Sequence, residues 1–186
     1  RESLTFSQGF SSLAKIRYRL TGSPAIITVD IQTNVNGTAT NNDSGWISIG
    51  EENFRNVSGD VNKLISPSDS KDKVITWNVG EIMPEFQMRN GSCRAVVKAW
   101  TTDAPPDYMV AELDGSGALR YYTCAEALPG GLHSNRVYRT TSLVMRRIHA
   151  KGIPWTMRGG NYPHTVILTN DYYIGVFDVT QKQWET

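Results

Sequence analysis

Residues 162–186 have the sequence YPHTVILTNDYYIGVFDVTQKQWET, and no other part of the chain carries so specific a pattern. Apolar side chains recur there at alternate positions, the period of a strand that turns every second residue into a core. They are Val166, Leu168, Tyr172, Ile174 and Val176. The turn-forming residues 169–171 interrupt the run, so the sequence predicts two short strands joined tightly.

The pattern changes after this second strand. Thr180 stands three residues before Gln183, the spacing of a capping box, in which the hydroxyl meets the third helical N–H and the amide returns to the cap. The sequence therefore predicts a helix that starts after Thr180. Because the sequence stops at Thr186, we expect little more than one turn, which is marginal as an isolated helix.

These residues resemble the opening of the formylglycine-generating-enzyme-like domain, also called the sulfatase-modifying-factor domain, which is similar to C-type lectins. The resemblance is carried by Pro163, His164, Val166, Leu168, Thr169, Tyr173, Ile174, Gly175, Val179, Thr180 and Trp184. The chain departs from the family before this stretch, where Arg158 follows Met157 in place of the usual glycine. The family's cysteine-bound copper and its chemistry belong to a region downstream of these motifs, so the resemblance implies no catalytic or cofactor-binding residue here.

The preceding residues resemble the immunoglobulin-like or fibronectin-like module that comes before this domain in large bacterial surface proteins. The resembling segments are SPAIITVDIQTN (23–34), NVSGDVNKLISP (56–67), KVITWNVG (73–80), CRAVVKAW (93–100) and PPDYMVAEL (105–113). This resemblance implies an exported bacterial protein, secreted or held at the cell surface. A start at Arg1 rather than Met is consistent with a removed signal peptide or with a trimmed sequence.

Composition is that of a folded chain with no strong overall charge. Lys and Arg total 19 against 18 Asp and Glu among 186 residues, and hydrophobic residues make up 39%. A net charge of +1 provides no general attraction for nucleic acid, and no apolar run is long enough for a transmembrane helix. We therefore expect neither nucleic acid binding nor a membrane span.

Strand patterns fill most of the chain. Ile16, Tyr18 and Leu20 alternate with basic residues, and a similar alternation over 25–32 predicts a second strand paired antiparallel with the first. Cys93–Trp100 is apolar at both parities, which predicts a central strand buried on two sides. Residues 34–45 have the composition of a polar loop. Short strands separated by turns predict an all-β protein, an antiparallel β-sandwich of the immunoglobulin or fibronectin type with a short C-terminal strand-strand-helix-start appendage.

The same patterns suggest a division of the chain. Strands are expected over 119–127 and 141–148, the latter being the last of the sandwich. We therefore assign 1–149 to the sandwich, 150–160 to a glycine-containing connector, and 161–186 to the truncated start of the family domain.

No residue pattern indicates catalysis or a metal. His133, His149 and His164 lie in separate segments without ligand spacing, and Asp103 and Asp107 flank a proline pair as turn residues do. We therefore expect no metal, no cofactor and no enzyme activity. Cys93 and Cys124 are the two cysteines; either they form a disulfide, as export permits, or each packs as a small hydrophobe.

Aromatic residues are the candidates for ligand or partner contact. In each of the pairs at 121–122 and 172–173, one ring must point away from the core if the segment is a strand. The candidates are Tyr122, Tyr173 and Trp155. Exposed rings of this kind bind sugars or proteins; the alternative is that they pack under neighbouring loops.

Three functional hypotheses follow. The first is a non-catalytic binding, adhesion or spacer module of an exported bacterial protein, attached to the beginning of a formylglycine-generating-enzyme-like domain. The second is a fragment of such an enzyme, and the third a fragment of a lectin-like ligand-display protein. A protein or carbohydrate partner fits the first hypothesis. Residues 162–179 are expected either to fold back onto the sandwich or to pair with a second copy in a homodimer.

Overall fold

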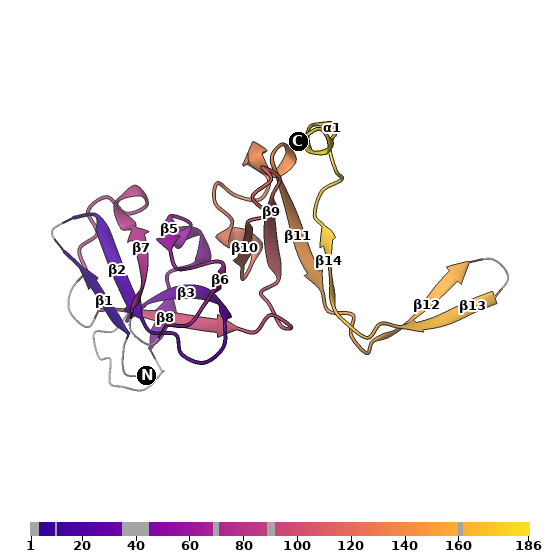
Figure 1. Ribbon diagram of the computed structural model, residues 1–186. Helices are drawn as coiled ribbons and strands as arrows, with labels where there is room; N and C mark the ends of the chain where they lie inside the picture. The colour runs from indigo at the N-terminus through magenta and orange to yellow at the C-terminus, as the bar shows by residue number, and fades with distance from the viewer. Residues whose placement is uncertain (1–3, 10, 35–44, 69–70, 89–91, 160–161) are drawn as a thin grey trace.

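The computed structural model describes residues 4–9, 11–34, 45–68, 71–88, 92–159 and 162–186. It is an all-β fold in which the named strands pair antiparallel, as predicted. A β-sandwich formed by the first hundred residues lies beside a second sheet, and one hairpin extends away from both (Figure 1). The predicted polar loop is outside this description at residues 35–44.

The first layer of the sandwich is a sheet in the order β1-β2-β7-β5. Its strands are β1 (Thr5–Gln8), β2 (Leu13–Tyr18), β7 (Lys73–Asn78) and β5 (Val57–Gly59). In β2 the buried residues Ala14, Ile16 and Tyr18 alternate with exposed ones, as the sequence predicted. The basic side chains of this strand therefore face solvent.

The second layer is built around β3 (Ala25–Asn34). Strand β8 pairs along one edge of β3, while β4 and β6 share the other. The partners are β4 (Trp46–Ser48), β6 (Leu64–Ile65) and β8 (Cys93–Trp100). The short 3₁₀ helices η1 (Glu51–Phe54) and η2 (Val79–Glu81) follow β4 and β7.

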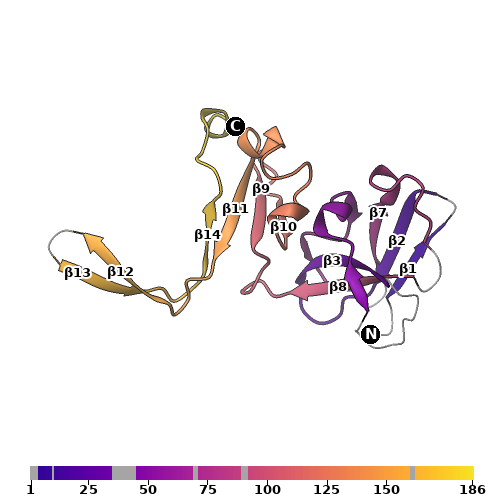
Figure 2. The ribbon, with the colours of Figure 1, turned by 180° about the vertical axis from the view of Figure 1, so that it is seen from behind.

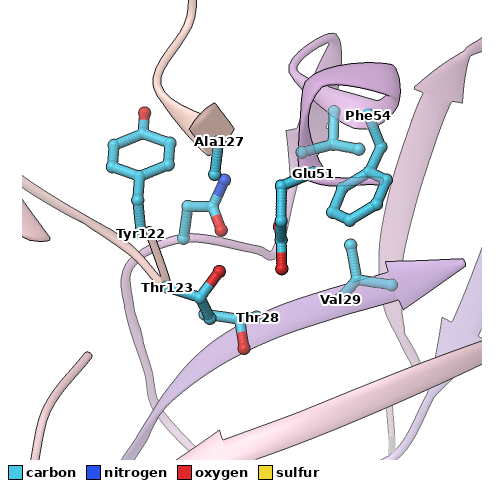
Figure 3. Close-up of a pocket in the computed structure, with 9 residues that line it drawn as sticks. Thr28, Val29, Glu51, Phe54, Tyr122, Thr123 and Ala127 are labelled. Carbon is cyan, nitrogen blue, oxygen red and sulfur yellow. The ribbon is translucent and has the colours of Figure 1, made fainter. Parts of the chain in front are cut away.

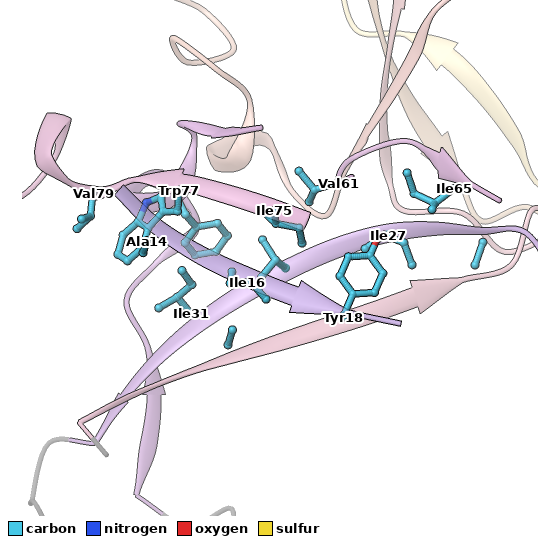
Figure 4. Packing of buried hydrophobic residues seen from close by; sticks show 14 residues of the cluster. Ala14, Ile16, Tyr18, Ile27, Ile31, Val61, Ile65, Ile75, Trp77 and Val79 are labelled. Carbon is cyan, nitrogen blue, oxygen red and sulfur yellow. The ribbon is translucent and has the colours of Figure 1, made fainter. Parts of the chain in front are cut away.

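The core of the sandwich lies between these two layers. Figure 4 shows Ile16, Ile75 and Trp77 of the first sheet packed against Ile27 and Ile31 of β3. Trp77 is fully buried, and its indole N–H donates to the backbone oxygen of Asn53 at 3.1 Å, so its polar atom is satisfied.

Two predictions about this core are wrong. Strands β2 and β3 do not pair, because β2 pairs with β1 and β7 and lies in the opposite layer. Strand β8 is not buried on both faces, since Val96 is exposed and Val97 is only partly buried against the core. Two-sided burial belongs instead to the central strand β3, where Ile26 and Thr28 are buried as well as the core-facing residues.

The second sheet has the order β10-β9-β11-β14. Its strands are β9 (Tyr108–Glu112), β10 (Leu119–Tyr122), β11 (Ser142–Ile148) and β14 (Tyr172–Gly175). Strand β10 is shorter than predicted, because residues 125–127 form the 3₁₀ helix η3 (Ala125–Ala127). A second, smaller cluster around Val110, Leu128 and Val144 forms the core of this sheet.

Strands β12 (Pro154–Gly159) and β13 (Tyr162–Ile167) form a two-stranded sheet of their own. Both views of the ribbon show this hairpin extending away from the rest of the molecule (Figures 1 and 2). The prediction that the strands before and after residues 169–171 are joined tightly as partners is wrong. Strand β13 pairs with β12, whereas β14 pairs with β11.

The predicted capping box is confirmed at α1 (Gln181–Trp184). The Thr180 hydroxyl accepts from the Gln183 N–H at 3.2 Å, and the Gln183 side chain accepts from the Thr180 N–H at 3.0 Å. The Gln183 amide also donates to the backbone oxygens of Tyr138 at 3.2 Å and Ser142 at 2.7 Å. These bonds attach the short helix to β11 and to η4 (Arg136–Arg139).

The proposed connector at 150–160 includes strand β12 rather than irregular chain alone. Strand β11, expected to end the sandwich, pairs with β14 of the expected appendage. Residues 172–175 thus fold back onto the chain, while 162–167 pair within the hairpin. The division of the chain into 1–149, 150–160 and 161–186 stays a prediction.

Candidate functional site

Tyr122 does not present its ring to solvent, so for this residue the alternative of packing against its neighbours holds. It lies in β10, is 8% exposed and belongs to the second hydrophobic cluster. Burial raises the pKa of its hydroxyl. The neighbouring Tyr121 is the partly exposed member of the pair, and its backbone N–H donates to Asn62 of the sandwich at 2.8 Å. In this strand Tyr122 therefore faces the core, and Tyr121 faces away from it.

Tyr122 lines a small cavity between the sandwich and the second sheet. Figure 3 shows the Glu51 side chain directed toward Thr28 and Thr123 in this space. The cavity has a volume of about 10 Å³, room for roughly one water molecule. Burial raises the pKa of the Glu51 carboxyl, and a hydrogen bond with Thr123 partly offsets that rise. The cavity is too small for a ligand and is part of the contact between the two sheets.

Tyr173 is half-buried and holds β14 against the segment before β9. Its hydroxyl donates to the backbone oxygen of Pro106, and burial raises its pKa to about 12. The ring therefore contributes to the wall of a cleft, with its polar atom already in use.

Trp155 is the one exposed ring of the three candidates. It lies on β12, is 45% exposed and is paired with Val166 of β13. Cross-strand partners share a face of a hairpin, so Trp155, Val166, Met157 and His164 lie on one face together with Tyr162. That face is mostly apolar, and four of its five members are exposed.

The hairpin also carries charge of one sign. Residues 150–170 contain Lys151, Arg158 and His164 but no Asp or Glu. A two-stranded hairpin without a covering layer is only marginally stable in water. An exposed apolar face of this kind is therefore suited to a partner that covers apolar surface.

A partly buried ion pair fixes the base of this hairpin. Arg147 of β11, whose side chain is 11% exposed, pairs with Asp171 at 2.8 Å and donates to the backbone oxygen of Pro105 at 2.6 Å. The other Asp171 carboxylate oxygen accepts from the Lys151 N–H at 2.9 Å. Hydrogen bonds from Lys151 and from Arg147 lower the pKa of Asp171. Together they join the end of β11, the residue before β14 and the proline segment.

His149 extends this network. Its Nε2 lies 2.8 Å from Asp107 Oδ1, and its Nδ1 lies 3.3 Å from Asp171 Oδ2. Asp107 had been interpreted as a turn residue. This network could not be predicted from the sequence, because Arg147 is distant in the chain from Asp171 and His149 is distant from Asp107, and no short sequence pattern connects them.

The two cysteines and the potential metal ligands do not form the sites that were considered for them. Cys93 and Cys124 are both free and partly buried, so the disulfide alternative is not realised. Over the described residues, no group of three or more His, Cys, Asp or Glu side chains has an arrangement that could hold a metal ion. Within the same part of the chain, no helix has the length and apolar character needed to cross a membrane.

Comparison with known proteins adds no assignment: no family model, no curated protein and no solved structure matches this chain. The exposed face of the β12–β13 hairpin and the cleft at its base are thus defined by geometry alone.

Proposed function

We propose that the chain is a non-catalytic binding module of an exported bacterial protein, in which the C-terminal region meets a protein partner. One observation carries this proposal. Among the described residues, sixteen large hydrophobic side chains are exposed, and nine of them fall between positions 153 and 184. They are Ile153, Trp155, Met157, Tyr162, Ile167, Tyr172, Ile174, Val179 and Trp184. Such a concentration is typical of an interaction surface.

The resemblance of residues 162–184 to the start of a formylglycine-generating-enzyme-like domain supports the same proposal. It places the sandwich next to a lectin-like domain in proteins of the cell surface. The sandwich then acts as binding, adhesion or spacer unit, and the hairpin as the contact element.

A second copy of the chain is the partner that the strand geometry favours. Strand β14 is the last strand of its sheet. Over the described residues it pairs with β11 along one edge, and no strand pairs with its other edge. Unpaired backbone groups on an exposed apolar edge favour pairing with another strand. A symmetric dimer through residues 162–179 would cover this edge and part of the hairpin.

Light scattering coupled to size-exclusion chromatography tests this arrangement. The chain is expected to be a dimer, and the double variant Ile174→Ser, Val179→Ser, which removes two exposed apolar side chains of the pairing segment, a monomer. The matched control is Ile47→Ser, which replaces an exposed apolar residue of β4 in the sandwich and should leave the dimer intact. A chain that is monomeric at all concentrations contradicts the dimer. The partner of the exposed apolar surface would then be a different protein.

A further inference from the structure

A cleft of about 510 Å³ lies beside the base of the hairpin. Residues 102–105, the end of β11 with Lys151, and residues 170–173 line it. This volume lies within the range of about 300 to 1,000 Å³ that is usual for small-molecule sites. Residues 170–173 of the cleft belong to the segment proposed for the protein contact, whereas residues 102–105 and Lys151 lie outside that segment.

The walls of the cleft are fixed without a ligand. Arg147 holds the proline segment through Pro105 and the turn before β14 through Asp171. Tyr173 adds a hydrogen bond to Pro106 from the same side. Because these groups already satisfy one another, a ligand entering the cleft would not have to order its walls.

The groups that remain available are of mixed polarity. Thr102, Asp103, Lys151 and Asn170 are exposed along the cleft, and they offer a hydroxyl, a carboxylate, an ammonium and an amide. Tyr172 lines it too, with 44% of its surface exposed. The site thus combines one aromatic ring with several hydrogen-bonding groups.

The charges of these groups balance each other. The pKa of Asp103 is lowered first by a hydrogen bond from Thr101, and further by the positive charges of Lys151 and Arg147. Arg147 is in turn paired with Asp171. An anion would meet the Asp103 carboxylate and a cation the Lys151 ammonium, so the cleft favours a neutral ligand with many hydroxyl groups.

We propose that this cleft binds a neutral saccharide. One face of a sugar ring lies on Tyr172, its hydroxyls donate to Asp103, and they accept from Lys151 and Asn170. An aromatic ring supplies apolar contact for the C–H face of the sugar, while the polar groups fix its orientation. This inference goes beyond the proposed protein contact and does not depend on it.

Native gel electrophoresis of the whole chain in gels that contain laminarin, xyloglucan, galactomannan or arabinoxylan tests the proposal. At least one of these neutral polysaccharides is expected to retard the protein. Tyr172→Ala and Asp103→Ala should each weaken this retardation at least about tenfold, as expected when a hydrogen bond or stacking contact worth about 1.4 kcal/mol is lost. Both residues are exposed, so both variants should fold, and circular dichroism verifies this.

The matched control is Leu119→Ala, which removes an apolar side chain that is 40% exposed on β10, outside both the cleft and the proposed protein contact. It should bind as the unchanged chain does. Absence of retardation in all four gels overturns the proposal. Retardation that survives both Tyr172→Ala and Asp103→Ala overturns it as well, because the sugar then binds elsewhere. Asp103→Ala should leave the oligomeric state unchanged, which separates this result from that of the protein contact.

Discussion

Replacing Gln183 by methionine tests what attaches the C-terminal helix to the second sheet. Gln183 is 6% exposed, and its amide bonds to Thr180, Tyr138 and Ser142. Methionine keeps the length and the helix propensity of the side chain but cannot make these three bonds. The matched control is Gln181→Met in the same helix, because the Gln181 amide contacts only the exposed Glu185 carboxylate at 2.8 Å.

The size of the effect follows from the number of bonds. A neutral hydrogen bond contributes about 0.5 to 1.5 kcal/mol net, so three of them contribute roughly 1.5 to 4.5 kcal/mol. A loss of about 2 kcal/mol in the attachment of the helix corresponds to a roughly 30-fold increase in its open population. Gln181→Met should change the same quantity by less than about 0.5 kcal/mol, since its amide is solvated.

Amide hydrogen exchange measured by NMR reports this opening locally. The Trp184 N–H donates to Thr180 and the Glu185 N–H to Gln181, both at 3.1 Å. Both amides should exchange faster in Gln183→Met and at nearly the original rate in Gln181→Met. Equal acceleration in the two variants would refute the argument, because the helix would then be held by something other than the buried amide.

Two further predictions concern charged groups. Arg147→Met should lower Tm by at least about 5 °C because it removes the partner of Asp171 and the bond to Pro105. The exposed neighbour Arg146→Met should shift Tm by less than about 2 °C, and similar shifts would show that the ion pair is unimportant. Glu51 has a raised pKa in the folded state, so its protonated form is favoured there and stability is lost as pH rises above its ordinary pKa of about 4.3. In urea unfolding, Glu51→Gln should therefore gain more stability over the unchanged chain at pH 7 than at pH 4; an equal difference at both pH values would contradict this sign.

The sequence was most informative where a single segment contains the whole pattern. The alternation in β2 and the capping box at Thr180 depend on residues a few positions apart, and the structure confirms both. Pairing between strands that are distant in the chain could not be predicted from such local patterns. Strand β2 pairs with β7, and Ile16 lies opposite Ile75. The alternation of apolar residues in β2 does not tell whether its partner is β7 or β3.

The hairpin could have been predicted and was not. Trp155 and Met157 precede the sequence Gly-Gly-Asn at 159–161, and His164 and Val166 follow it, which is a hairpin pattern. The glycines between residues 150 and 160 instead predicted a flexible connector, and this prediction did not include strand β12. The cleft is different, because it depends on Arg147 reaching Asp171 across two strands. Such a contact becomes visible only when the register of β11 with β14 is known.

The two hydrophobic clusters share no residue, and their order along the chain has a consequence for synthesis. Every strand pair of the sandwich is complete at Trp100, whereas the second sheet needs β14. Since domains fold as units from the N-terminus as the chain emerges from the ribosome, the sandwich is expected to fold first. A nascent chain that has not yet reached Tyr172 leaves β11 with an unpaired edge. Until Tyr172 has emerged, the edge of β11 that β14 will occupy is therefore the part of this sheet most prone to pair with another chain.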